Sequence, residues 1–370
     1  MRKTLLQATA ALALLAYGVP AHAADPAQAM KDLETHILVT GAHGEQASPI
    51  ASVSLTPEEL QKIKDMHATA AIVMHYGGND WSRAQVEALK AKFTDMGIRV
   101  VAVTDAGFKA EKQVSDVETV MAQKPSIIVA APVDPAATAS AFKAAADAGT
   151  KIVFMNQSPN GMVAGKDFVS VVSADEYGNG VASALLLGQS LNGKGEVGLV
   201  FHAADFHVTR QRYEAVKKTL ADDFPGIKVV AEQGIGGPDF PGDAEKAASA
   251  MLTSHPRIKG IWAVWDVPAE GVISAARNAG RDDLVITTID LGENVAIDMA
   301  SGGYVKGLGG QRVYDQGLTE ATLAGYGLLG KAAPAYVASP ALPVDKGNLL
   351  ASWQTVYHVP APDKVSKSME

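Results

Sequence analysis

The sequence contains no cysteine among its 370 residues. This absence excludes disulfide bonds, cysteine-ligated iron–sulfur clusters, thiolate zinc sites and a cysteine nucleophile. A basic excess is also missing, since 40 acidic residues outnumber 32 Lys and Arg residues and give a formal net charge of −8. We therefore expect no nucleic-acid partner. Hydrophobic residues make up 47% of the chain, too many for a disordered protein, and the length suggests two domains of about 150 residues each.

The N-terminus has the pattern of a secretory signal peptide. Arg2 and Lys3 give a positive start, Leu5 to Ala16 is almost entirely apolar, and Ala21-His22-Ala23 forms an A-x-A cleavage site. This pattern predicts export, with cleavage after Ala23. An uncleaved anchor helix is the alternative, but the apolar run is too short to span a bilayer. Removal of the two basic residues leaves 30 basic against 40 acidic residues, a net charge of −10.

A segment with little sign of a sheet follows, from residue 24 to residue 68. Within it, Thr56-Pro57-Glu58-Glu59 has the features of a helix start. Thr56 suits the N-cap, Pro57 the first helical position, and Glu59 completes a capping box. We predict a short helix over 57–66 on an N-terminal extension.

From residue 69 the chain alternates strands and helices. Thr69 to Met74 is a nearly continuous apolar run, as expected of a strand that is buried on both faces. The spacing then predicts a helix from Ser82 to Met96, which Gly97 ends. The same criteria give further strands over 98–103, 126–131, 151–155, 196–201, 227–231, 260–264 and 284–289, and helices over 114–122, 136–148, 178–191, 209–220, 244–254 and 269–279. Two such series predict an α/β fold with two lobes, each built on a parallel sheet with helices on both faces.

Polar and aromatic side chains recur just after these strands, where ligands bind in open parallel sheets. They are found in His75 to Trp81, Asp105, Pro132-Val133-Asp134, Asn156-Gln157, His202 to Arg210, Pro238-Asp239-Phe240, Trp265-Asp266 and Asp290. Their paired donors and acceptors suit the adjacent hydroxyls of a sugar or polyol, and an aromatic face can cover the C–H side. The alternative is that they only cap helices and satisfy loop backbone. The recurrence at so many strand ends favours a binding site.

Signals for enzymatic or metal chemistry are weak, and we expect no catalytic residue, no cofactor and no metal. Gly193, Gly195 and Gly198 match a dinucleotide-binding fingerprint, but they precede a strand instead of following one and indicate a turn. No Walker A loop and no G-x-S-x-G elbow is present. His202 and His207 leave a metal site open as an alternative, although such loop histidines more often face solvent or a ligand.

These strand-end residues resemble those of the periplasmic sugar-binding proteins of ABC transporters, in particular the ribose-binding (type I) proteins. The resemblance runs from about Thr69 to the C-terminus. Its most specific pieces are Pro132-Val133-Asp134, Thr209-Arg210-Gln211-Arg212, Pro238-Asp239-Phe240, Trp265-Asp266 and Thr288-Ile289-Asp290. It implies two doubly wound lobes joined by a hinge, the first from 69–173 with 312–342 and the second from 174–311 with 343–370.

The resemblance also implies which residues bind the ligand. They are Asn79, Trp81, Asn156 and Gln157 in the first lobe, Arg210, Phe240, Trp265 and Asp290 in the second, and Gln311 at the hinge. The family commonly has Asp-Arg at the position of Asn156-Gln157, and ribose binders often have Asn-Asp at the position of Trp265-Asp266. The residues of this chain would suit a linear polyol, a deoxy sugar or another small polar solute.

The function implied by the resemblance is capture of a small sugar or polyol in the periplasm, closure of the lobes over it, and delivery to an ABC transporter permease. We expect a monomer. A sensory role, in which the closed form docks to a chemoreceptor, is compatible with this interpretation. A lactose-repressor-like regulator would need an N-terminal helix-turn-helix and a cytoplasmic location, and a periplasmic enzyme would need a nucleophile–base pair.

Overall fold

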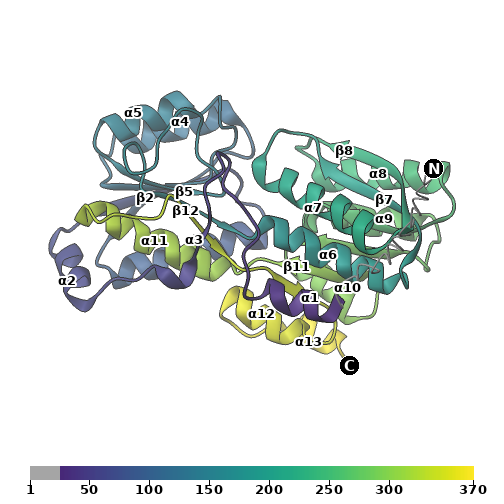
Figure 1. The fold of residues 1–370 in the computed structure, drawn as a ribbon. Helices are drawn as coiled ribbons and strands as arrows, with labels where there is room; N and C mark the ends of the chain where they lie inside the picture. Colours follow the sequence, from purple (N-terminus) through teal and green to yellow (C-terminus); the bar gives the residue numbers. More distant parts are fainter. Residues whose placement is uncertain (1–25) are drawn as a thin grey trace, which may run out of the picture.

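The computed structural model describes residues 26–370 and shows two α/β lobes side by side (Figure 1). The predicted signal peptide and its cleavage after Ala23 lie outside the described residues. None of the helices in residues 26–370 has the length and apolar character of a membrane-spanning segment. The expected α/β fold with two parallel-sheet lobes is confirmed.

The first lobe is built on a seven-stranded sheet in the order β1-β12-β6-β5-β4-β2-β3, and all its neighbouring strands are parallel. Figure 1 shows α4 and α5 above this sheet and α3 and α11 below it. The strands are β1 (Ser48–Pro49), β2 (Thr69–Met74), β3 (Arg99–Asp105), β4 (Ile127–Ala130), β5 (Lys151–Met155), β6 (Ser170–Ala174) and β12 (Tyr336–Ser339). The helices are α3 (Asp80–Asp95), α4 (Ala110–Met121), α5 (Ala139–Asp147) and α11 (Val313–Leu329).

The second lobe is built on a six-stranded sheet in the order β13-β11-β10-β9-β7-β8. Its strands are parallel except for β13, which pairs antiparallel with β11 at the edge. The strands are β7 (Lys194–His202), β8 (Gly226–Ile235), β9 (Ile258–Ala263), β10 (Val285–Ile289), β11 (Val305–Gly310) and β13 (Leu342–Val344). The helices are α6 (Glu176–Ser190), α7 (His207–Asp223), α8 (Phe240–Ser254), α9 (Asp266–Asn278), α10 (Glu293–Ala300), α12 (Leu349–Tyr357) and α13 (Asp363–Ser368).

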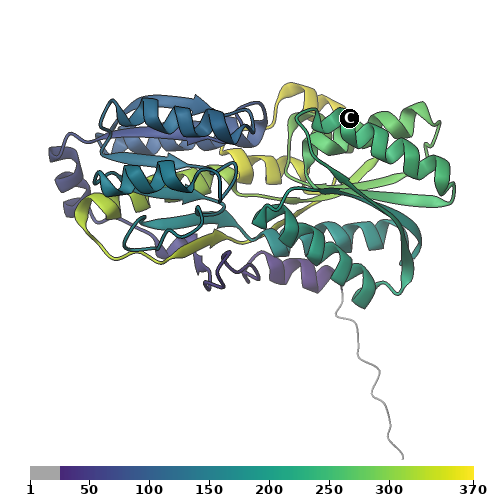
Figure 2. The same ribbon diagram turned by 90° about the horizontal axis from the view of Figure 1, so that it is seen from above.

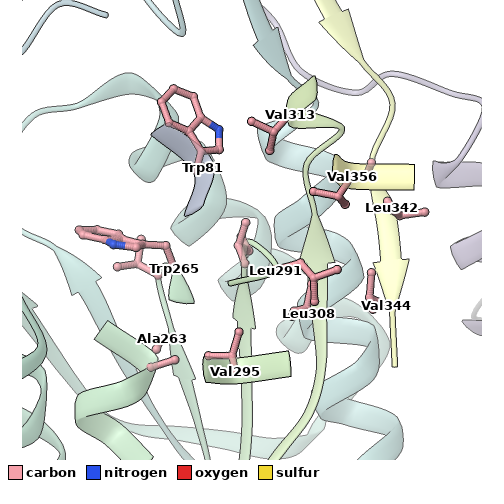
Figure 3. Close-up of a cluster of buried hydrophobic side chains, with 14 of the residues drawn as sticks. Trp81, Ala263, Trp265, Leu291, Val295, Leu308, Val313, Leu342, Val344 and Val356 are labelled. Carbon is pink, nitrogen blue, oxygen red and sulfur yellow. The ribbon is translucent and has the colours of Figure 1, made fainter. Parts of the chain in front are cut away.

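The chain crosses between the two sheets at the β6–α6, β11–α11 and β12–β13 connections. Figure 2 shows the lobes joined in the middle by chain segments from several parts of the sequence. Apolar side chains fill this junction: Trp81 of the first lobe, Leu291 of the second and Val313 of a crossing segment belong to one buried cluster (Figure 3). The lobes therefore share a packed junction, and the three crossing segments hold the two lobes together there.

The N-terminal extension packs on both lobes. The predicted short helix is confirmed as α2 (Pro57–Asp65), and its capping box forms, because Glu59 N donates to Thr56 Oγ1 and Thr56 N donates to Glu59 Oε2. The extension also contains α1 (Pro26–Leu33), a short 3₁₀ turn η1 (Ile50–Ser52), and β1, which adds the outermost strand to the first sheet. Of the three fingerprint glycines, Gly193 lies in the turn between α6 and β7, as predicted, whereas Gly195 and Gly198 lie within β7 itself.

Candidate functional site

A cavity of about 190 Å³ lies between the lobes at the carboxyl ends of both sheets. Its walls are formed by residues that come at or after the ends of β2, β3, β4 and β5 in the first lobe, and of β7, β8, β9 and β10 in the second. Ligands bind at this edge of open α/β sheets because the loops there are free to vary while the strands hold them in place. Seven of the nine residues predicted to bind the ligand line this cavity, namely Asn79, Trp81, Asn156, Phe240, Trp265, Asp290 and Gln311.

Two predicted residues, Gln157 and Arg210, do not line the cavity. The Gln157 side chain is buried beside it, and its Oε1 accepts a hydrogen bond from the backbone amide of His207. The Arg210 side chain is 47% exposed and forms an ion pair with Asp205. The structure therefore does not place Arg210 in the cavity, and its role in ligand binding stays a prediction.

Arg212 takes that place, because it lines the cavity and is only 4% exposed. Two residues along an α-helix point about 200° apart, so Arg210 and Arg212 face opposite sides of α7. The apolar positions of this helix, such as Val208 and Val216, lie four residues on either side of Arg212 and are buried with it. That spacing in the sequence is the signal that could have identified Arg212.

Arg212 is the centre of a buried ionic network. Its Nε lies 2.6 Å from Glu176 Oε2, and its Nη1 lies 3.3 Å from Asp290 Oδ2. Gln311 donates from Nε2 to Asp290 Oδ1 at 2.6 Å and accepts at Oε1 from Trp81 Nε1 at 3.2 Å. The hydrogen bonds thus run from Trp81 of the first lobe through Gln311, in the β11–α11 crossing, to the charged groups of the second lobe.

Two carboxyl groups near Arg212, those of Glu176 and Asp266, have raised pKa values. Burial raises the pKa of Glu176 to about 7, although the charge of Arg212 opposes this. Burial and the neighbouring charge of Asp290 raise the pKa of Asp266 well above its usual range. Burial disfavours the guanidinium of Arg212, but the carboxylates of Glu176 and Asp290 more than offset this and raise its pKa. Arg212 therefore stays charged, while Glu176 and Asp266 can hold a proton.

Asn156 and Asp290 occupy equivalent places in the two lobes, directly after β5 and β10. Both have a left-handed backbone, with φ of 67° and 71°. Asn and Asp tolerate this conformation better than other residues with a side chain. The sharp turn at each strand end brings an amide to one side of the cavity and a carboxylate to the other.

Aromatic rings form a continuous wall across both lobes. In the second lobe, Phe240 contacts Trp265 with ring centroids 4.9 Å apart. Across the cleft, Phe108 of the first lobe meets Phe240 edge to face at 5.3 Å, and His75 stacks with Phe206 at 6.4 Å. Such faces cover the C–H side of a small polar solute and exclude water.

Two histidines of this wall are neutral at pH 7. Burial lowers the pKa of His75 to about 4, and burial together with the charge of Arg212 lowers the pKa of His202 to about 4. His75 Nδ1 is buried without a hydrogen-bond partner in the described structure, whereas His202 Nδ1 lies 3.2 Å from Thr209 Oγ1. His207 does not line the cavity, because its ring contacts the carbonyl oxygen of Thr40. Among residues 26–370, no three His, Asp or Glu side chains are grouped to hold a metal.

Some of the strand-end residues also satisfy the backbone that follows them. Asn79 caps α3, because its Oδ1 accepts from Ser82 N, and Asp134 Oδ1 accepts from Ala136 N in the turn before α5. Backbone hydrogen bonding and cavity lining are therefore combined in the same side chains. The polar and aromatic cavity residues that were not predicted to bind the ligand are His75, Tyr76, Phe108, Asp134, His202, Asp205, Phe206, Thr209 and Arg212. Most of them follow strands whose ends had been identified.

Comparisons with known proteins extend these observations. A family model described as "Periplasmic binding protein domain" matches residues 70–331. The chain is 28% identical to a putative rhizopine-binding protein of Rhizobium meliloti over 54% of this chain, a match that spans 65% of that protein, slightly less than two thirds. It is 30% identical to a D-ribose/D-allose-binding protein of Pseudomonas aeruginosa over 63% of this chain and 71% of that protein.

A similar solved structure is an ABC transporter solute-binding protein of Agrobacterium vitis bound with α-D-tagatopyranose. The TM-score is 0.72 at 20% identity, and the match covers 78% of this chain and 99% of that chain. At this identity the similarity shows a shared fold. The family match begins at residue 70, so α1, β1 and α2 lie outside it.

Proposed function

The chain belongs to the periplasmic binding protein family, and from this premise we propose that it captures a small sugar or polyol between its lobes and delivers it to the permease of an ABC importer. The observation that carries this proposal is the cavity, which joins paired polar groups to aromatic faces from both lobes. Its volume of about 190 Å³ is below the roughly 300–1,000 Å³ of pockets for drug-sized ligands and suits a small solute.

The polar groups fit a neutral polyhydroxylated solute. Arg212 and the Asn156 amide are donors, Asp290 is an acceptor, and the positive charge of Arg212 already has Glu176 and Asp290 as partners. A neutral ligand adds no charge to this network, whereas a charged ligand would have to be desolvated without a free partner. The aromatic rings supply the complementary apolar contact.

Closure of the lobes is part of the proposed mechanism. Contacts between Phe108 and Phe240, and between Gln157 and His207, link the two walls beside the cavity. A solute that touches both walls adds contacts only when the lobes are together, so it stabilises the closed arrangement and is released when they part.

A thermal-shift screen of the purified protein tests this function. The panel contains pentoses, hexoses, deoxy sugars and linear and cyclic polyols, with ribose, allose and tagatose included because proteins similar to this one bind sugars of those names. A solute that binds only the folded state raises the melting temperature as its concentration increases. A panel in which no sugar or polyol raises it would refute the proposed ligand class.

Location and partners are proposals of the same kind. We propose a periplasmic location, with the signal peptide removed after Ala23, and N-terminal sequencing of the exported protein checks this. The permease is the partner implied by the family. Docking to a chemoreceptor and a monomeric state remain predictions, which pull-down and light-scattering measurements would test.

A further inference from the structure

The N-terminal extension crosses from one lobe to the other. Its first helix, α1, packs against α6 and β13 of the second lobe, whereas β1 lies at the edge of the first sheet. Figure 1 shows this purple segment running between the lobes after α1 and reaching α2 at the far end of the first lobe. We call residues 37–49 the strap.

The strap is hydrogen-bonded to α7 of the second lobe and to Asp175 in the β6–α6 crossing. The backbone amide of Leu38 donates to Asp175 Oδ2 at 2.8 Å, next to the start of α6. The carbonyl oxygen of Thr40 lies 2.9 Å from His207 Nε2 and accepts from Gln211 Nε2 at 2.9 Å. His207 and Gln211 are one turn apart on α7, so this carbonyl contacts a single face of that helix.

The same few residues are anchored in the first lobe. The Val39 side chain is buried in a cluster with Phe154 and Tyr336, which belong to β5 and β12. Ser48 and Pro49 pair with β12 in parallel register. The strap thus has an apolar anchor and a strand pairing on one lobe and polar contacts on the other.

The contact on α7 lies directly behind the cavity. His207 follows Phe206, which lines the cavity, and its backbone amide is bonded to Gln157, the neighbour of the cavity residue Asn156. Gln211 precedes Arg212. The face of α7 that carries His207 and Gln211 meets the strap, while Thr209 and Arg212 line the cavity.

We propose that the strap is a fourth connection between the lobes, which favours their closed arrangement and positions α7 for binding. This inference deepens the proposed function, because it assigns the closure to particular residues outside the family match. Separation of the lobes would take Thr40 and Leu38 away from α7 and Asp175, or pull Val39 and β1 out of the first lobe. Each lost hydrogen bond shifts the balance between open and closed arrangements.

The test measures the distance between the lobes without any solute. The chain has no cysteine, so Glu118→Cys on α4 and Lys246→Cys on α8, both exposed, accept spin labels at unique positions. Leu38→Pro removes the amide donor, and Leu38→Ala is the matched control, since the Leu38 side chain is largely exposed and its N–H is kept. We expect the ratio of long to short distances to rise about threefold to tenfold in Leu38→Pro alone. Equal distributions in the two variants would overturn the proposal.

A second variant covers the case in which Leu38→Pro does not fold. His207→Ala with Gln211→Ala removes both donors to Thr40, and Lys218→Ala on the exposed face of the same helix is its control. The double variant should open the ligand-free lobes and release a solute from the thermal-shift panel about threefold to tenfold faster, while Lys218→Ala does neither. An unchanged distance in the double variant refutes the strap even if a sugar binds, and a failed sugar screen leaves the ligand-free measurement intact.

Discussion

The two walls of the cavity differ in their buried charges. The second lobe buries Arg212 with Glu176, Asp290 and Asp266 around it. The first lobe has no such network among its cavity residues, and it contributes mainly rings and amides, such as those of Trp81 and Asn156. A buried charge is held firmly only by a fixed set of partners, whereas rings and amides tolerate small shifts.

This difference suggests that the two lobes contribute differently to ligand binding. We infer that the second lobe, with its preformed ionic network, supplies most of the binding energy and stays organised when the cleft is open. The first lobe supplies a neutral wall that fits against the solute when the lobes close. Loss of a group from the second wall should therefore cost more than loss of one from the first.

The largest effect is expected from Arg212→Ala. Removal of one partner of a buried ion pair leaves Glu176 and Asp290 uncompensated, so the free energy of unfolding should fall by about 3–5 kcal/mol. Urea unfolding measures this change. The matched control is Arg210→Ala, whose exposed ion pair with Asp205 is worth no more than about 1 kcal/mol. A larger loss in Arg210→Ala than in Arg212→Ala would contradict the assignment.

The next effect is expected from Asp290→Asn, which keeps the shape and the left-handed backbone but removes the charge that faces Arg212. Affinity for the solute found in the thermal-shift screen should fall at least about thirtyfold, because truncating one partner of a buried charge pair costs roughly 2–5 kcal/mol. Titration calorimetry provides the measurement. Retention of full affinity would exclude Asp290 from the site.

Asn156→Gly tests the equivalent position of the first lobe. Glycine accepts the left-handed backbone, so the fold should keep its stability while the solute loses an amide contact worth about threefold to tenfold in affinity. Asn156→Ala is the comparison, since alanine at positive φ should also lower the unfolding free energy by about 1–2 kcal/mol. If Asn156→Gly weakened binding more than Asp290→Asn, the inference that the second lobe supplies most of the binding energy would be wrong.

The smallest effect concerns pH. The folded-state pKa of His202 is about 4, below the ordinary value of 6.5, so the unfolded chain binds more protons between these values. Its contribution to stability is present above pH 6.5 and is lost as the pH falls towards 4. The pKa of Glu176, raised to about 7, acts in the opposite direction between pH 7 and 4.5. The urea midpoint of His202→Gln should therefore decrease less, or increase more, than that of the wild type between pH 7 and 5. Parallel curves would contradict the low pKa of His202.

Much of the fold could be predicted from the sequence because buried parallel strands are short apolar runs. The bounds of β2 and β5 agree with the prediction, and the helix ends at Gly97 and Gly149 follow from glycine at positive φ. The strands β12 and β13 have four and three residues, and β1 has only two, so none is long enough to show a hydrophobic pattern in the sequence. Their place is decided by pairing with distant strands.

The positions of the site residues could be predicted where the sheet fixes them, and could not be predicted where a helix face or a loop decides them. Residues that directly follow strands, such as Asn156 and Asp290, could be placed because the sheet fixes where strand ends lie. Arg210 was assigned from the family resemblance, whereas the spacing of buried residues such as Val208 and Val216 places Arg212 on the buried face of α7. Phe108 lies three residues beyond the end of β3, where the course of the loop decides its position.

A calorimetric titration of the best solute from the screen into the wild type, Arg212→Ala and Asn156→Gly tests the two-lobe site most directly. We expect one solute per wild-type chain, weaker binding in both variants, and the larger loss in Arg212→Ala. A solute that binds both variants with wild-type affinity would contradict a site formed by the two lobes together.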